Sequence, residues 1–243
     1  MNFDDPQNLI LRSLSEGVRT AVMAAAEPVH FNLRERACEP NSDCKYVDFI
    51  ESGVMSLLTV MDDGTLVELA TIGREGMLGV SVALGVSSIA ELVICQVEAS
   101  AWRVPVAVFQ RLLSEHQELV AICGHFGMAL FENVSINTGC NRLHPVEKRC
   151  ARWMLLTHDR CDSDSFTLTQ EFLATMLGVS RTSVNFAAGL LLKARVISYT
   201  RGKVTVLDRD KLEVISCACY KGMNACYKKI MGFEPTNSVA LAS

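Results

Sequence analysis

The sequence lacks the features of a secreted or membrane-spanning protein. No uninterrupted apolar run among its 243 residues approaches the roughly 18 residues that a membrane span requires. The first ten residues, MNFDDPQNLI, are acidic and have neither the basic start nor the apolar core of a signal peptide. We therefore predict a cytoplasmic protein with no membrane partner.

Catalytic motifs are absent as well. The sequence contains no GxSxG, no glycine-rich Walker loop and no HExxH. The acidic pair Asp62-Asp63 stands directly before Gly64 and belongs to a predicted turn rather than to a general acid and base. These absences predict that the chain is not an enzyme.

The ten cysteines lack the paired CxxC spacing typical of a zinc site. Cys217 and Cys219 form a CxC, with Cys226 seven residues further on. Thiols of a cytoplasmic chain are expected to stay reduced, so we predict no disulfide, no metal ligand and no cofactor. Three cysteines in apolar surroundings are expected to be small core residues: Cys95, Cys123 and Cys140.

Charge is distributed unevenly along the chain, whose formal net charge is -4. The segment from Lys148 to Lys211 holds eleven Lys and Arg against six Asp and Glu, so it carries +5 and the remaining residues carry -9. A basic segment attached to an acidic body is expected when one domain alone meets a polyanion.

The first half of the chain changes from a helical to a strand pattern. Residues 1–26 are predicted to form an N-terminal helical segment that leads into the strands. Residues 27–112 contain short segments rich in β-branched residues about ten residues apart, with a hairpin signal at 62–64. They predict a small antiparallel β-roll of jelly-roll type. The chain is long enough for this domain and a second one.

A long helix is predicted next, over 113–144, because no proline stands between Pro105 and Pro145. Apolar residues recur along it at helical steps with few charges beside them, which favours dimerisation through this helix. The alternative is a helix that packs only on its own roll. The seam consists of Leu119, Cys123, Phe126, Leu130, Val134 and Asn137.

Residues 145–216 predict a winged helix-turn-helix. Two short helices, from about 169 to 177 and from 181 to 194, are separated by Gly178-Val179-Ser180, and Thr169 and Ser180 are candidate caps. The second helix would expose a small, polar and positive face of the kind that enters a DNA major groove. That face consists of Arg181, Thr182, Asn185 and Gly189.

The remaining DNA contacts are predicted from the same region. A hairpin around Arg201-Gly202 with Lys203 would form a wing that meets phosphates. Asp208 is a candidate cap for a closing helix, and residues 217–243 are expected to form a loosely ordered tail. The predicted DNA-binding residues are Thr169, Gln170, Ser180, Arg181, Thr182, Ser183, Asn185, Arg201 and Lys203.

Residues 46–216, about 70% of the chain, resemble a CRP/FNR-type transcription regulator. The resemblance lies in FIESGVMSLLTVMDDG and TIGREGMLG of the roll, NRLHPVEKRCARWMLLTHDR at the junction, and LTQEFLATMLGVSRTSVNFAAGLLLKARVI of the helix-turn-helix. It implies an α+β fold with a cyclic-nucleotide-binding-like roll, a long dimer helix and a winged helix-turn-helix. It also implies a homodimer on a near-palindromic DNA site, contact with RNA polymerase, and Arg181 as the arginine of the recognition helix.

The sequence departs from the family pattern at two positions of the recognition helix. Family members often have a glutamate at the position of Thr182 and an arginine at that of Phe186, so their base preference does not transfer. Only the mode in which this helix docks on DNA is expected to transfer from the family to this chain.

The effector is harder to predict. Gly73, Glu75 and Gly76 keep the family's turn and are candidate pocket residues, although glycines serve roll geometry equally well. No Arg or Lys stands between Arg74 and Arg103, so a cyclic nucleotide would lack the cation that a buried phosphate needs. Two alternatives stay open: a thiol or metal redox sensor, with Cys150 and Cys161 as candidates, and a regulatory module that acts through protein contacts.

Overall fold

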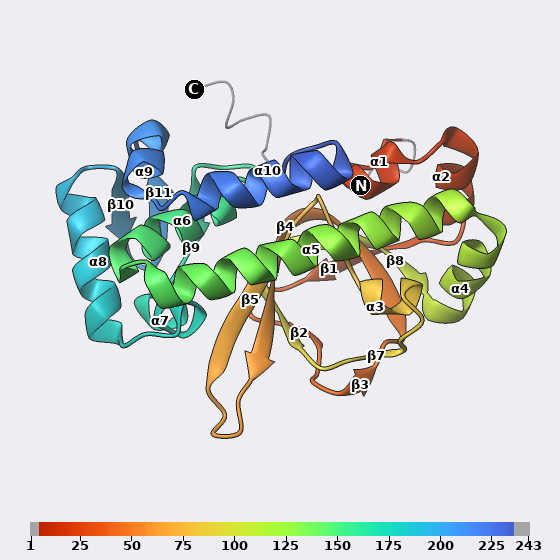
Figure 1. The fold of residues 1–243 in the computed structure, drawn as a ribbon, viewed down its shortest axis with the longest axis horizontal. Helices are drawn as coiled ribbons and strands as arrows, with labels where there is room; N and C mark the ends of the chain where they lie inside the picture. The colour runs from red at the N-terminus through yellow and green to blue at the C-terminus, as the bar shows by residue number, and fades with distance from the viewer. Residues whose placement is uncertain (1–4, 236–243) are drawn as a thin grey trace.

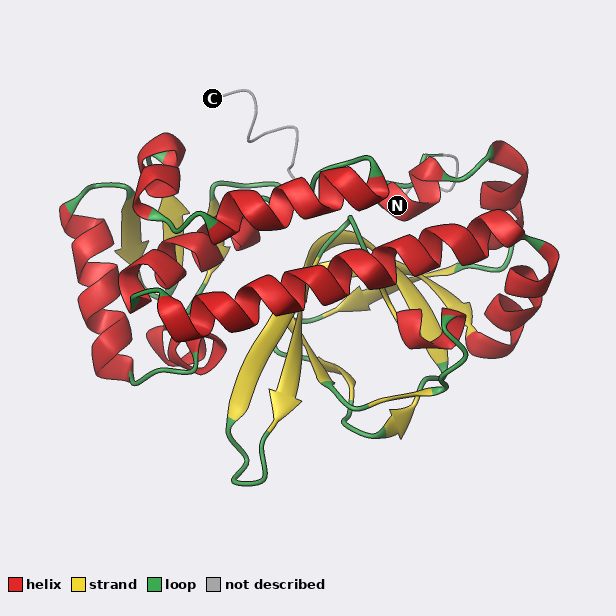
Figure 2. Ribbon diagram, viewed as in Figure 1, coloured by secondary structure: helices red, strands yellow, loops and turns green. Residues whose placement is uncertain are grey.

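The structure is a computed structural model that describes residues 5–235. Figures 1 and 2 show a β-roll, a smaller domain of helices and short strands at one end, and two long helices that run along both. The chain begins with α1 (Leu9–Ser13) and α2 (Glu16–Met23). The Asn8 side chain caps α1 by accepting a hydrogen bond of 3.1 Å from the backbone N–H of Leu11.

The roll, residues 27–105, is antiparallel throughout. Its main sheet runs in the order β1 (Glu27–Phe31), β8 (Leu92–Pro105), β4 (Tyr46–Val60) and β5 (Leu66–Ile72), with β2 (Arg36–Cys38) on β8 and β6 (Met77–Leu78) on β4. β3 (Ser42–Asp43) pairs with β7 (Ser88–Ile89), and α3 (Val80–Ala83) follows β6. The predicted hairpin joins β4 to β5: Gly64 has φ +81°, and Asp63 Oδ1 accepts from the backbone N–H of Thr65 at 2.9 Å.

The predicted long helix is two helices. α4 (Val106–Glu115) ends at His116, whose extended backbone (φ -131°, ψ 95°) separates it from α5 (Gln117–Leu143). The expected start at residue 113 was therefore wrong by four residues, since position 113 still belongs to α4. α5 runs across the roll and on to the second domain (Figure 1).

The tail expected to be loosely ordered is a helix over much of its length. α10 (Cys219–Met231) lies beside α5 (Figure 1), and Gly222 comes within 4.0 Å of the Ile136 side chain. Its buried residues recur at helical steps, so one face is apolar enough to pack. They are Tyr220, Met223, Asn224, Cys226, Tyr227 and Met231. Residues 236–243 of the predicted tail lie outside the described part of the chain.

The second domain, residues 145–216, is called the reader below. It contains α6 (Val146–His158), β9 (Ser165–Thr167), α7 (Gln170–Leu177), α8 (Arg181–Lys193), β10 (Ile197–Thr200), β11 (Lys203–Val206) and α9 (Arg209–Ile215). The strands form one sheet in the order β10, β11, β9. Asp208 caps α9, as predicted, by accepting from the backbone N–H of Lys211 at 3.0 Å. The predicted α+β fold of antiparallel roll, long helix and winged helix-turn-helix is confirmed.

Two apolar cores hold these parts together. The first joins the roll to α5 and α10 and includes Trp102, Phe126 and Tyr227. The second is the core of the reader, and it also contains Val54, Leu58 and Leu92 of the roll. α6 belongs to the second core, and its last ten residues are all buried. The roll and the reader therefore share buried surface.

α5 is the one helix in the described residues that is long and apolar enough to cross a membrane, judged by length and composition alone. Core helices of soluble proteins pass the same test. Here one face of α5 carries buried Asn133 and Asn137, and Asn137 donates hydrogen bonds to the carbonyls of Glu68 and Leu69 in β5. That face of α5 packs against the rest of the protein.

Candidate nucleic-acid interface

α7 and α8 are joined by the predicted turn. Thr169 accepts from the backbone N–H of Phe172 at 3.1 Å, and Ser180 accepts from that of Ser183 at 3.2 Å, so both predicted caps are confirmed. Gly178 ends α7 with φ +61°, a left-handed conformation that favours glycine. The buried Arg149 of α6 donates a hydrogen bond to the carbonyl of Leu177, the last residue of α7. This bond gives that carbonyl a partner at the end of the helix.

α8 buries one face and leaves the other open. Val184, Ala187, Ala188 and Leu191 pack inward. The opposite face is exposed and consists of Arg181, Thr182, Asn185, Phe186 and Gly189. Among residues 5–235, no hydrogen bond or ion pair engages the Arg181 side chain. A guanidinium without a protein partner at the start of an exposed helix is free to meet an external anion or base edge.

The remaining predicted contacts lie around this helix. Ser183 is half-buried, and its hydroxyl is 3.0 Å from that of Ser180. Gln170, also half-buried, begins α7. Thr169 carries a second contact, because Arg34 of the roll donates to its hydroxyl at 3.3 Å. Its oxygen is therefore shared between the cap and the roll.

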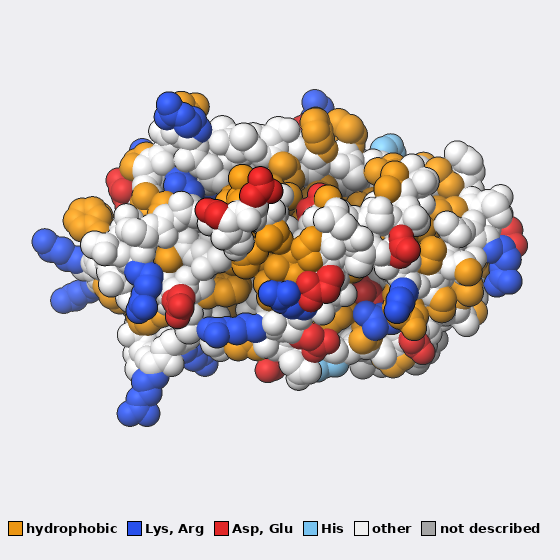
Figure 3. All heavy atoms as spheres, turned by 90° about the horizontal axis from the view of Figure 1, so that it is seen from below, with side chains coloured by type: hydrophobic (Ala, Val, Ile, Leu, Met, Phe, Trp, Pro, Cys, Tyr) orange, Lys and Arg blue, Asp and Glu red, His pale blue; other side chains and the backbone are white. Residues whose placement is uncertain are grey.

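The wing is a tight hairpin. β10 and β11 pair from Ile197 with Val206 to Thr200 with Lys203, and the turn between them is Arg201-Gly202. Arg201 (φ +51°) and Gly202 (φ +78°) both have left-handed backbones, which lets a two-residue turn close the strands. Arg201 and Lys203 are exposed. Figure 3 shows Lys and Arg side chains gathered at the end of the molecule where Figure 1 places the reader.

Sequence and structure comparisons agree with this geometry. Residues 148–215 match the family model described as a Crp-like helix-turn-helix domain. The chain carries a Crp-like helix-turn-helix domain. No curated protein matches the sequence.

Solved structures share most of this architecture. A putative transcriptional regulator of the CRP/FNR family from Eubacterium rectale is 18% identical, with a TM-score of 0.66 over 85% of this chain and 96% of that one. FixK2 from Bradyrhizobium japonicum is 13% identical, with a TM-score of 0.65 over 79% and 98%. TTHB099, a CRP-family transcriptional regulator from Thermus thermophilus, is 18% identical, with a TM-score of 0.64 over 77% and 96%. At these identities the likeness shows the fold, and the predicted resemblance to CRP/FNR-type regulators is confirmed.

The candidate pocket residues of the roll, Gly73, Glu75 and Gly76, lie where the roll contacts the reader and α5. Glu75 is fully buried and forms an ion pair of 2.8 Å with the buried Arg160, which lies in the turn after α6. A Cβ on Gly73 would come within 2.7 Å of the Arg160 side chain, and one on Gly76 within 2.5 Å of the Phe126 ring. These residues take part in close packing between the roll, α5 and the turn after α6, and none of them lines the cavity described next.

A different cavity lies between the roll and α5. It has a volume of about 330 Å³ and apolar walls, and Glu91 is the one charged residue among the described residues that line it. α3 and β8 form one side and α5 the other. The lining includes Leu57, Ile72, Leu84, Gly127, Leu130 and Phe131.

The candidate redox cysteines are both inside the protein. Cys150 is fully buried in α6 and Cys161 is 7% exposed. Burial raises the pKa of each thiol to about 12, which disfavours the reactive thiolate. Burial of both thiols therefore does not favour Cys150 or Cys161 as a redox sensor.

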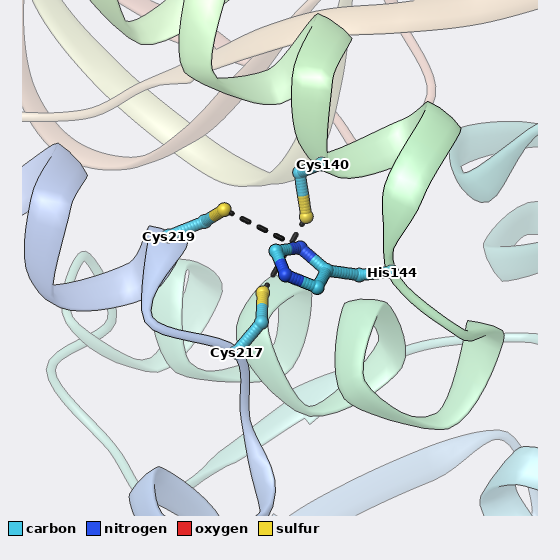
Figure 4. Close-up of side chains that lie close together, drawn as sticks. All are labelled: Cys140, His144, Cys217 and Cys219. Carbon is cyan, nitrogen blue, oxygen red and sulfur yellow. Dashed lines mark hydrogen bonds between the residues drawn. The ribbon is translucent and has the colours of Figure 1, made fainter.

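Two features of the molecule escaped the sequence analysis. A groove separates the start of α8 from the hairpin between β4 and β5, with Thr65 on one side and Arg181 on the other. In addition, four side chains that bind metals in other proteins converge at the end of α5: Cys140, His144, Cys217 and Cys219 (Figure 4). Cys140 is buried, as expected of a core residue, and its sulfur also lies 3.4 Å from that of Cys217.

Proposed function

We propose that the chain is a transcription regulator that binds a near-palindromic DNA site as a homodimer and needs no cyclic nucleotide. The observation that carries the proposal is the open face of α8. A recognition helix must present its N-terminal side chains to base edges, and Arg181 is exposed there with no hydrogen bond or ion pair to any described residue.

The chemistry of this face suits a major groove. The Arg181 fork can donate two hydrogen bonds to guanine O6 and N7, and Asn185 matches adenine N6 and N7. Gly189 lets the helix approach the bases. The hydroxyls of Ser180, Thr182 and Ser183 and the cations of the wing suit phosphate oxygens, as do Thr169 and Gln170 at the start of α7.

The dimer is supported by the outer face of α5. Exposed positions recur there at steps of three or four residues, and none of them is charged. An uncharged stripe along a helix is typical of a helix-to-helix interface. Two readers so joined would meet major grooves about 34 Å apart. The stripe consists of Ala121, His125, Met128, Phe131, Ser135 and Thr138.

The cavity beside α5 supports independence from cyclic nucleotides. A buried phosphodiester needs a paired cation, and none of the described residues that line the cavity is Lys or Arg. Calorimetric titration with cyclic AMP or cyclic GMP should give no saturable binding, and saturable binding would contradict this part of the proposal. Contact with RNA polymerase, implied by the family resemblance, completes the proposed role.

Arg181→Ala tests DNA recognition. On the sequence selected from a random DNA pool by the wild-type chain, the variant should lose about 1–3 kcal/mol of binding free energy and discriminate less between bases at one position. Arg111→Ala is the matched control, because it removes the same charge from the exposed surface of α4. Lys203→Ala should weaken binding to all sequences alike and reduce the salt slope by about one.

Two results would reject the proposal. Unchanged DNA affinity and salt dependence in Arg181→Ala would favour a module that acts through protein contacts. Equal losses in Arg181→Ala and Arg111→Ala would mean that net charge, not recognition by α8, determines binding.

A further inference from the structure

We propose that Cys140, His144, Cys217 and Cys219 bind a single zinc-type divalent metal ion in a tetrahedral site. The site would join the end of α5 to the segment between α9 and α10. Cys140 and His144 are one turn apart in sequence, and the other two ligands form the CxC that precedes α10. The four side chains point toward a common centre (Figure 4).

The distances suit one ion. The four donor atoms all lie within 4.8 Å of one another. The sulfurs of Cys140 and Cys217 are 3.4 Å apart, and the sulfur of Cys219 is 3.5 Å from Nδ1 of His144. Zinc binds thiolates at about 2.3 Å and imidazole at about 2.0–2.1 Å, so ligands around a tetrahedral ion stand about 3.5–3.8 Å apart. Small side-chain movements would complete the geometry.

The surrounding charge is the second, independent observation. Arg149 and Arg152 are buried beside the cluster, and each interacts electrostatically with its thiols. Within residues 5–235, neither arginine forms an ion pair with a carboxylate. Their hydrogen-bond partners are neutral: Asn141 and the carbonyl of Leu177 for Arg149, and Asn137 and Met223 for Arg152.

Two buried guanidiniums that form no ion pair within the described part of the chain are costly unless negative charge lies nearby. A divalent ion with three thiolates and one neutral imidazole carries a net charge of -1. The loaded site would therefore compensate part of this buried positive charge.

Other uses of the cluster fit less well. A disulfide needs its sulfurs about 2.05 Å apart, whereas those of Cys140 and Cys217 are 3.4 Å apart. An iron–sulfur cluster places several iron and sulfide atoms between its ligands, so its ligands must stand further apart than those of one ion. Donor atoms this close together enclose the volume of a single ion.

The position of the site gives it a mechanical consequence. α9 is the last helix of the reader and ends at Ile215, two residues before Cys217. A bound ion would link this end of the reader directly to the last turn of α5. Metal loss would leave the α9–α10 connection held by packing and by the hydrogen bonds of Tyr220 with Arg209 and Asp159, without disturbing the open face of α8.

Metal content tests the site directly. Full-length protein purified under reducing conditions with added zinc should contain one zinc ion per chain by elemental analysis. Cobalt(II) added to the metal-free protein should give the intense visible and thiolate charge-transfer absorption of a tetrahedral site. In competition with a chromophoric chelator, Cys219→Ser and His144→Asn should each bind zinc at least about tenfold more weakly than the wild type.

Cys226→Ser is the matched control. Cys226 lies on α10 and contacts α5 through Ala129 and Glu132, but it is outside the cluster. It should retain one ion per chain. Circular dichroism of each metal-free variant separates loss of a ligand from loss of the fold. Chelation should lower the thermal midpoint of the wild type and Cys226→Ser by more than that of Cys219→Ser.

Three outcomes would overturn the assignment. The first is no tight zinc or cobalt binding by reduced, folded wild type. The second is zinc binding that is unchanged in both Cys219→Ser and His144→Asn. The third is acid-labile sulfide with iron in protein purified without oxygen, which would identify a cluster in place of a single ion. None of these bears on DNA binding by Arg181, so the two proposals can fail separately.

Discussion

At the scale of single residues, Glu68 occupies an unusual position between the roll and the reader. It is 5% exposed, and burial raises the pKa of its carboxyl to about 7. The Ser56 hydroxyl lies 2.9 Å from Glu68 Oε1 and 2.8 Å from Gln96 Oε1, yet it has one proton to donate. A protonated Glu68 resolves this, because it donates to Ser56 and leaves the Ser56 proton for Gln96.

The rest of this network crosses to α6. Trp153 donates from Nε1 to the second oxygen of Glu68 at 2.6 Å. The Gln96 amide donates to the Thr157 hydroxyl at 2.8 Å. A neutral Glu68 therefore satisfies every group along the line from β5 to α6 without placing a charge at the junction.

Glu68→Gln should flatten the dependence of stability on pH. The pKa is higher in the folded state than the unfolded value of 4.5, so the folded protein retains a proton that the unfolded chain loses. Stability from this group is present below about pH 4.5 and is lost as pH rises through 7, at up to about 1.4 kcal/mol per pH unit. Glutamine keeps the neutral donor and acceptor, so the variant should lose this slope.

Urea unfolding at about pH 5 and about pH 8 measures the effect as the difference between wild type and variant. Glu115→Gln, on the exposed end of α4, is the control and should keep the wild-type slope. If Glu68→Gln retains that slope and is less stable at both pH values, then Glu68 is charged in the folded protein.

At the scale of elements, α5 has two different faces. The inner face carries buried residues from Leu119 to Cys140 and packs on the roll and α10. The outer face exposes apolar side chains, with Met128 at 49% and Phe131 at 64%. Along its 27 residues the helix has three charged residues, Glu118, Glu132 and Arg142. Exposure of this kind is typical of an interaction face.

Met128→Glu tests whether this face forms the dimer. A carboxylate in an apolar interface must be desolvated without a partner, so the variant should dissociate at least about tenfold more readily. Sedimentation velocity over a concentration series gives the dissociation constant. Val214→Glu places the same charge on an apolar position of α9 that is 86% exposed, and it should leave the oligomeric state unchanged. A monomeric wild type would refute the dimer outright.

At the scale of the whole molecule, the shared core makes the roll and the reader one folding unit. Leu58 is fully buried on β4, yet it belongs to the core of the reader. The buried pair of Glu75 and Arg160 joins the same two parts. Because each part completes the other, we expect one cooperative transition in which both unfold together.

Leu58→Ala should therefore destabilise the entire chain, by about 2–5 kcal/mol, while keeping a single transition. Scanning calorimetry checks both the midpoint and the agreement of calorimetric and van't Hoff enthalpies. Val60→Ala is the control on the same strand, because Val60 is 41% exposed and loses little contact. Two separate transitions would show that the domains unfold independently.

How much could be predicted depended on how far apart in sequence the interacting residues are. The caps of α7 and α8, the turn at Gly178 and the wing at Arg201-Gly202 are determined by neighbours within a few residues, so local patterns were sufficient. The period of α10 was also present from Tyr220 to Met231. The prediction of a loosely ordered tail depends instead on Pro235, Asn237 and Ser238, which follow this period in the sequence.

By itself, the sequence determined the strands of the roll, the two helices and wing of the reader and the side chains that α8 exposes, because these follow from backbone preferences and the periodicity of apolar residues. Only the tertiary structure decided that Glu75 pairs with Arg160, that Glu68 lies between two domains, and that Cys140 and His144 meet a CxC more than seventy residues away. Such contacts depend on how whole helices and strands pack together, and the spacing of residues along the chain does not predict them.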